Sequence, residues 1–179
     1  MIIERLTSPV NEADLRALAQ LLADTVSNGD AVSFLAPLPV NDAAAWWRKT
    51  LTESHLKSVF LVARDAEGIA GTVQLHPAWA PNQPHRAEVA KLMIHPRARR
   101  RGLGRLLMQA VESAARESGC TLLTLDARSG GAAERLYRDT GWIPVGTIPD
   151  FALDPDGRGM HATVIFYKNL VGPGDKRGG

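Results

Sequence analysis

The hydrophobic positions switch between strand-like and helix-like spacing along the chain, and they predict a mixed α/β protein. Short apolar runs between turn residues indicate strands, while apolar residues three and four positions apart indicate helices. Strands are expected at 2–6, 59–63, 69–75, 89–94, 121–126, 142–147 and 163–168. Helices are expected at four places. The first is capped by Asn11, and the second by Asn41 or Asp42. The third begins at Leu103, and the fourth follows the turn at 129–131. The resulting order is a strand, two helices, three strands, a helix, a strand, a helix and two strands.

The stretch from Glu88 to Met108 is the most informative part of this pattern. Residues 89–94 are apolar except for Lys91, as in a strand buried on both faces, and Pro96 ends the run. Three arginines and Gly102-Leu103-Gly104 come next, and a helix then follows at once. Its expected apolar face consists of positions 103, 106, 107, 110, 111 and 114. Free N–H groups at a helix start beside fixed positive charges form an anion site suited to a pyrophosphate, which the glycines let approach closely.

Two other nucleotide-binding motifs do not fit this loop. The chain has no G-x-x-x-x-G-K-[ST], and Leu107 occupies the place of the third glycine in G-x-G-x-x-G. The alternative interpretation is a solvated arginine run that only caps a helix.

Length and composition favour one domain, expected at 1–171, followed by a glycine-rich charged tail at 172–179 that frays. The net charge of +2 is small and the arginines cluster at 97–105, so a local anionic ligand is favoured over a nucleic-acid surface. Cys120 is the only cysteine, and it can form neither an internal disulfide nor a zinc cluster. The histidines show no metal-ligand spacing, so no metal is expected.

No apolar run is long enough to cross a bilayer, and the first residues do not resemble a signal peptide. These features predict a cytoplasmic protein with no membrane partner.

The residues 99–104 resemble the [Q/R]-x-x-G-x-[G/A] motif of the GNAT family of N-acetyltransferases. The resemblance covers nearly the whole chain and is nearest to the tabtoxin-resistance acetyltransferase group, through residues 85–89, 91–93, 101–105, 125–126 and 155–158. It implies an α/β (α+β) fold with a single mixed, mostly antiparallel sheet of six to seven strands. Helices are expected on both faces. The central strand and the strand at 121–126 are expected to splay apart, with the pantetheine arm of CoA in the gap.

The same resemblance implies acetyl-CoA as co-substrate. The residues expected to bind it are Leu92, Met93, Ile94, Arg99, Arg100, Arg101, Gly102, Leu103, Gly104, Arg105 and Tyr137. Many relatives have a pantetheine-binding asparagine seven residues before the tyrosine. Gly130 stands there in this chain, so that contact is expected to be absent or supplied by backbone.

Acetyl transfer requires a deprotonated amine, hydrogen-bond donors for the thioester oxygen, and a proton for the leaving thiolate. Tyr137 is the candidate acid, because residues 133–142 resemble the family's A-x-x-x-Y-x-x-x-G-[F/W] segment. A phenol with a pKa near ~10 and a thiolate near ~8.5 can exchange a proton as the C–S bond breaks. The alternative is a tyrosine that only packs in the core.

Glu88 and Asp126 are the candidate carboxylates that bind the ammonium and remove its proton, and a backbone N–H near Leu92 is the expected oxyanion donor. The alternatives are that Glu88 pairs with Arg86 or Lys91, and that Asp126 caps a turn.

The sequence therefore predicts an N-acetyltransferase for a small amino-acid- or toxin-like amine, held between these carboxylates and the loop of Trp79, with toxin resistance as its role. The alternatives are a protein or peptide N-acetyltransferase and a non-catalytic CoA-binding regulatory module. A nucleic-acid-binding protein is disfavoured because few aromatic residues accompany the arginines. A monomer and a homodimer both remain open.

Overall fold

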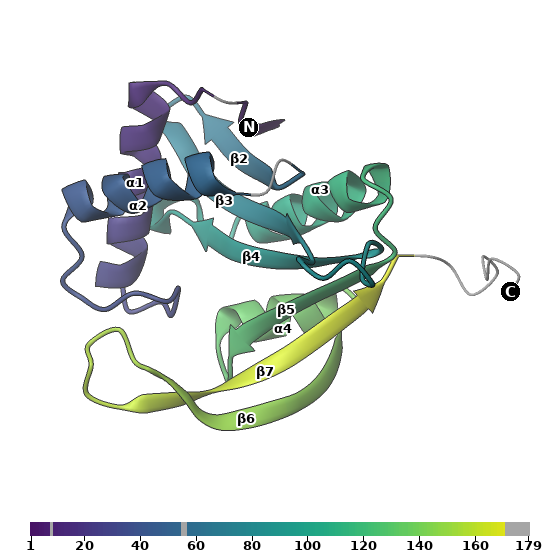
Figure 1. Ribbon diagram of the computed structural model, residues 1–179. Coiled ribbons are helices and arrows are strands. Elements are labelled where there is room, and N and C mark those ends of the chain that lie inside the picture. The colour runs from purple at the N-terminus through teal and green to yellow at the C-terminus, as the bar shows by residue number, and fades with distance from the viewer. Residues whose placement is uncertain (8, 55–56, 171–179) are drawn as a thin grey trace, which may run out of the picture.

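Seven strands form one sheet in the computed structural model, which describes residues 1–7, 9–54 and 57–170 (Figure 1). The strands are β1 (Ile2–Arg5), β2 (Val59–Asp65), β3 (Gly68–Pro77), β4 (Arg86–Ile94), β5 (Leu122–Arg128), β6 (Ile143–Leu153) and β7 (Met160–Asn169). The helices are α1 (Glu12–Ser27), α2 (Val40–Glu53), α3 (Leu103–Glu117) and α4 (Ala132–Asp139), with a short 3-10 turn η1 (Pro96–Ala98). The expected tail at 172–179 lies outside the described residues.

The sheet has the order β1-β2-β3-β4-β5-β7-β6. Every neighbouring pair is antiparallel except β4 and β5, which run parallel. A parallel pair needs a long crossover, and here α3 makes that connection between the two strands. The mostly antiparallel, mixed α/β sheet expected from the sequence is confirmed.

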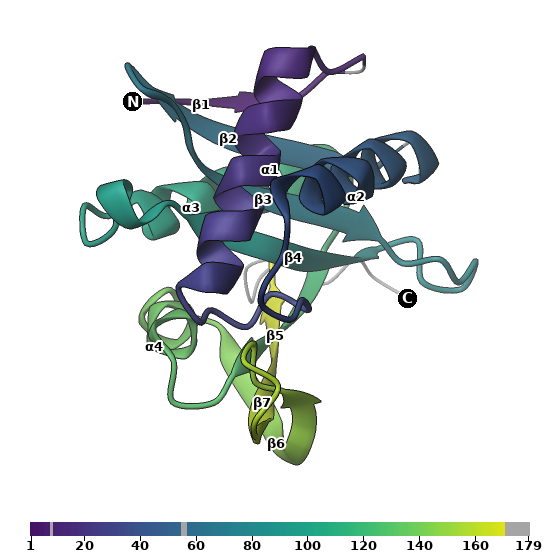
Figure 2. The same cartoon turned by 90° about the vertical axis from the view of Figure 1, so that its left-hand side faces the viewer.

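Helices cover both faces of the sheet. α1 and α2 pack on one face, where Trp47 and Leu22 are buried with Phe60 and Val62 of β2 (Figure 2). α3 and the Tyr137 side of α4 pack on the other face, in a second cluster of buried apolar residues. The two cores lie on opposite sides of β2, β3 and β4, so side chains of one strand alternate between them.

Helix boundaries agree with the sequence at α1 and differ at α2. The Asn11 side chain accepts a hydrogen bond from the Asp14 N–H at 2.8 Å, as a cap should. The expected cap of α2 at Asn41 or Asp42 is wrong, because the helix already begins at Val40 after Pro39. Proline supplies the extended conformation of a helix cap there without any side-chain hydrogen bond.

The apolar face of α3 is also rotated from the expected one. Leu106 is 47% exposed, whereas Met108 and Glu112 are buried. A glutamate can take a core position here because Lys168 of β7 forms an ion pair with it, and that partner is distant in sequence.

Candidate active site

β4 and β5 separate after a short parallel contact. Their paired positions are Arg86 with Leu122, Ala87 with Leu123, and Glu88 with Thr124. β4 then continues to Ile94 and β5 to Arg128 with no further pairing between them. The β5-facing edge of the rest of β4, which contains Leu92, Met93 and Ile94, therefore has no strand partner in the described chain. Such an edge can take an extended ligand as an additional strand.

A β-bulge interrupts β4 at the start of this edge. Ala90 pairs with Gln74 and Met93 pairs with Thr72, so Val73 of β3 faces both Lys91 and Leu92. Lys91 has a φ of 51°, in the left-handed region that side chains rarely adopt. A bulge leaves backbone groups unpaired and redirects the side chains beside it, and bulges are frequent next to active sites.

The loop between β4 and α3 forms the second part of the site. Gly102 caps α3 with a φ of 79°, and Arg100 before it has a φ of 59°. The N–H groups of Leu103, Gly104 and Arg105 in the first turn of α3 have no carbonyl partner among the described residues. Such donors and the helix dipole can bind an anion, so this turn is the candidate anion site.

The arginines of this loop differ in what they contact. Arg99 forms an ion pair with Asp30 and donates to the Ile94 carbonyl oxygen at 3.0 Å, so it ties the loop to the end of α1. Arg100 and Arg101 are exposed and have no ion pair or hydrogen bond with any described residue. Arg105 donates to the Asp139 carbonyl oxygen at 3.4 Å. Among the described arginines of this loop, therefore, only Arg100 and Arg101 have positive charges that no other residue of the described chain pairs with.

Gly104 also has a packing role. A Cβ at this position would lie 2.9 Å from Leu136 Cδ2, so the glycine lets the first turn of α3 approach α4 closely. That contact brings the helix of Tyr137 next to the anion site.

Tyr137 is placed in the core on the α3 side of the sheet. It is 5% exposed, and its ring packs against Trp142 and Phe166 at centroid distances of 6.0 and 5.9 Å. Burial, and secondarily the charge of Asp126, raises the pKa of the Tyr137 phenol. A tyrosine with a raised pKa stays protonated and can donate a hydrogen bond, although full proton transfer to a thiolate becomes harder.

Glu88 and Asp126 lie on one face of the sheet. Glu88 is opposite Thr124, and Asp126 is two residues further along β5, so both side chains point toward the α1–α2 side. Neither alternative expected for them occurs. Arg86 bonds to Gln83 and Thr124 rather than to Glu88. Asp126 Oδ2 lies 3.2 Å from the Thr163 hydroxyl of β7 instead of capping a turn.

A groove of about 420 Å³ opens next to Asp126. Its walls come from the α1–α2 connection, from the end of β5 and from the β6–β7 hairpin. The lining includes Ser33, Phe34, Asp126, Phe151, His161 and Thr163. The groove has the size of a site for a small molecule, and it places one candidate carboxylate in contact with the occupant.

One expected detail differs in the structure. Trp79 is 90% exposed and makes no ring contact within the described chain, so it does not wall this groove. The Gly130 N–H donates to Glu134 Oε2 at 2.6 Å, which favours the first of the two outcomes expected there, an absent pantetheine contact. The aromatic residues that line the groove are Phe34 and Phe151, and the Phe34 ring meets the Trp46 ring edge to face at 5.2 Å.

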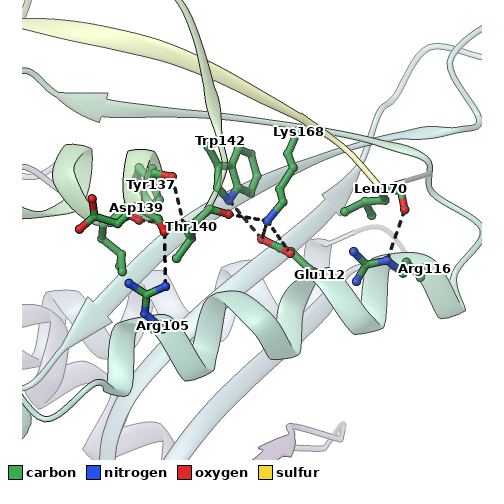
Figure 3. A network of polar contacts seen from close by, with 10 residues as sticks. Arg105, Glu112, Arg116, Tyr137, Asp139, Thr140, Trp142, Lys168 and Leu170 are labelled. Carbon is green, nitrogen blue, oxygen red and sulfur yellow. Dashed lines mark hydrogen bonds and ion pairs between the residues drawn. The ribbon is translucent and has the colours of Figure 1, made fainter. Parts of the chain in front are cut away.

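Sequence reasoning missed two groups of residues. Lys91 contacts Ser33 and the rings of Phe34 and Trp46, and the only sequence signal was a lysine inside an apolar run. The second group joins Glu112, Lys168, Trp142 and Thr140 behind Tyr137 (Figure 3). The only sequence signal for this second group was an acidic residue, Glu112, next to the apolar positions of α3.

In the described ranges, no cluster of three or more histidine, cysteine or acidic side chains could hold a metal ion. The helices of the same ranges include none that is long and apolar enough to cross a membrane.

Comparison with known proteins gives consistent matches. The acetyltransferase (GNAT) family model matches residues 18–142. An N-acetyltransferase encoded in the hisH-hisA intergenic region of Azospirillum brasilense is 32% identical over 128 residues, which are 70% of this chain and 74% of that protein. The L-methionine sulfoximine/L-methionine sulfone acetyltransferase of Pseudomonas aeruginosa is 28% identical over 139 residues, 76% of this chain and 79% of that protein.

Solved structures share the fold. The yncA acetyltransferase structure from Salmonella typhimurium, determined with its cofactor acetyl-CoA, superimposes with a TM-score of 0.75. The alignment covers 95% of this chain and 94% of that chain at 19% identity.

Proposed function

The chain belongs to the acetyltransferase (GNAT) family, and on this premise we propose that it transfers an acetyl group from acetyl-CoA to a primary amine of a small, amino-acid- or toxin-like molecule. One observation carries the proposal: the unpaired edge of β4 runs directly into the arginine loop and the free N–H groups of α3. The similarity to an L-methionine sulfoximine/L-methionine sulfone acetyltransferase supports an amino-acid analogue as acceptor. Detoxification of such an analogue is the biological role we propose.

The residues at this edge fit acetyl-CoA. The backbone of Leu92, Met93 and Ile94 would pair with the pantetheine arm. The N–H groups of the first α3 turn, together with Arg100 and Arg101, would hold the pyrophosphate. When bound, acetyl-CoA supplies a thioester carbonyl, and a C–N bond to the acceptor forms as the C–S bond breaks.

The remaining groups of the chain perform three tasks. Glu88 and Asp126 attract the ammonium of the acceptor and take up its proton, directly or through water. A backbone N–H at the bulge near Leu92 donates to the carbonyl oxygen as that oxygen gains charge. Tyr137 donates from its hydroxyl toward the sulfur, which leaves as the thiol.

The test is an assay of free CoA with acetyl-CoA and a panel of small primary amines, with mass spectrometry to identify the acetylated product. Amine-dependent thiol release would support the proposal. Acetylation of peptide amino termini or lysines without any small-molecule product would assign the chain to protein acetylation instead. Binding of acetyl-CoA with no acetylation of either class would leave the non-catalytic CoA-binding module.

A further inference from the structure

Lys91 is a charged residue in the middle of the site for which the mechanism above has no task. It lies at the β4 bulge, opposite Val73, with its φ in the left-handed region. Its Nζ donates to Ser33 Oγ at 2.8 Å. Since Ser33 lies in the α1–α2 connection and lines the groove, the bulge aims this ammonium toward the groove.

The Lys91 ammonium is only partly satisfied there. Its Nζ lies 5.8 Å from the centroid of the Phe34 ring and 5.9 Å from that of the Trp46 ring, at the outer range of cation–π contacts. An ammonium has three N–H donors, and Ser33 accepts only one of them. No carboxylate of the described chain lies within ion-pair distance of Lys91 Nζ. Two donors therefore remain for another partner.

Opposite charges lie on the same side of the sheet. Burial lowers the pKa of Lys91, and the charges of Asp126 and Glu88 act against this shift, so both carboxylates are within electrostatic range. Glu88 and Asp126 face the α1–α2 side, and Lys91 reaches that side too. One cation and two anions thus lie on the side of the sheet where the groove opens beside Asp126.

Gln74 adds an unsatisfied donor to this region. It pairs with Ala90, one residue before Lys91, and its side chain is on the same face as Phe60 of β2. Gln74 Oε1 lies 2.8 Å from His76 Nε2, but Gln74 Nε2 is buried with no partner among the described residues. A buried donor without an acceptor costs stability, and an acceptor oxygen of a molecule bound on this face could satisfy it.

We infer that Lys91 determines acceptor specificity: its ammonium binds the carboxylate of an amino acid whose amine lies at Glu88 and Asp126. The inference rests on the proposed function and narrows its acceptor to amines that also carry an acid group. A zwitterion matches this charge arrangement, since each of its ends meets the opposite charge. A polyamine would instead place a second ammonium against Lys91, and like charges repel.

The experiment compares each of a panel of L-amino acids with its own carboxamide, which keeps the shape and the α-amine but removes the negative charge. The wild type, Lys91→Met and Lys91→Arg are assayed on both. The wild type should prefer the acids, and Lys91→Met should lower that acid-to-amide ratio of kcat/KM about tenfold or more, mainly through KM. Lys91→Arg should retain most of the preference. Lys49→Met, which removes an exposed lysine on α2, serves as the matched control.

The ratio separates specificity from other roles of Lys91. If the wild type turns over acids and amides alike, or if Lys91→Met lowers both equally, then Lys91 shapes the bulge or handles protons, and the inference is wrong.

Calorimetry of the CoA-bound protein with the same pairs provides a readout that does not need turnover. Acid-selective binding that Lys91→Met abolishes, without thiol release, would support the inference while refuting the catalytic proposal. Equal or absent binding of both members of every pair would overturn the inference itself.

Discussion

Replacing Lys168 by methionine would test how the acetyl-CoA half of the site is held together. Lys168 Nζ lies 2.7 and 2.8 Å from the two carboxylate oxygens of Glu112 and 2.7 Å from the Thr140 carbonyl oxygen (Figure 3). Trp142 Nε1 donates to Glu112 Oε1 at 3.2 Å. Glu112 is on α3 and Thr140 ends α4, so this ion pair joins the helix of the anion site to the helix of Tyr137.

The cost of Lys168→Met can be worked out from the burial of the pair. The side chains of Lys168 and Glu112 are only 19% and 8% exposed, so the variant leaves a buried carboxylate whose remaining hydrogen-bond donor in the described chain is the Trp142 indole N–H. Removing one member of a buried pair costs about 3–5 kcal/mol, and the partial exposure of Lys168 favours the lower end. A loss of about 3 kcal/mol in a protein of this size lowers Tm by about 6–12 °C.

Urea unfolding followed by circular dichroism measures this loss, and calorimetry measures whether acetyl-CoA affinity falls with it. Lys49→Met is the matched control, since its pair with Glu53 is exposed, spans 3.8 Å, and should be worth less than about 1 kcal/mol. The double variant Glu112→Leu/Lys168→Met removes both charges and should recover part of the loss. If Lys168→Met costs no more than the control, the ion pair does not hold the two helices together, and the reasoning is wrong.

Three further changes test the site itself. Arg100→Glu combined with Arg101→Glu should raise the Kd for acetyl-CoA about tenfold or more, equivalent to about 1.4 kcal/mol; an unchanged Kd by calorimetry would contradict the anion site. Tyr137→Phe should lower kcat about tenfold or more with little change in KM for acetyl-CoA. Because the pKa of Tyr137 is raised, the phenol stays protonated as pH rises, so wild-type kcat should not fall over about pH 8 to 10; full activity of the variant across pH would leave Tyr137 a packing residue. Glu88→Gln and Asp126→Asn, singly and together, should move the rising limb of the pH–rate profile upward, since the free amine must then come from solution; an unchanged profile would exclude both carboxylates as the base.

The sequence predicts element type and order well because those depend on local spacing. The α1 cap at Asn11, for example, is decided by neighbouring residues and occurs as expected. The apolar face of α3 is different, since Glu112 becomes a core residue only through Lys168, which lies 56 positions further along the chain. Spacing on one helix cannot reveal such a partner.

In the candidate site, too, features set by neighbouring residues were predictable, and features set by distant residues were not. The glycine loop and the start of α3 are consecutive in sequence, so an anion site was predictable. The sequence does not reveal which of the arginines are free to contact a ligand. Arg99 is hydrogen-bonded to Asp30, which lies 69 positions away in the chain. Arg100 and Arg101 are therefore expected to contact a ligand, whereas the motif alone specifies position 99 and leaves positions 100 and 101 open.

Lys91 shows most clearly why alternation along a strand could not predict which way a side chain points. In a regular strand, Val89, Lys91 and Met93 would share one face, and Lys91 would enter the core beneath α3 beside Val89. A lone ammonium in that core would be strongly unfavourable. The bulge adds one residue, so Met93 packs with α1 and α2 instead, and Lys91 reaches Ser33. The lysine and the bulge thus depend on each other: the bulge removes the charge from the core, and the same turn of the backbone aims that charge at the groove beside Asp126.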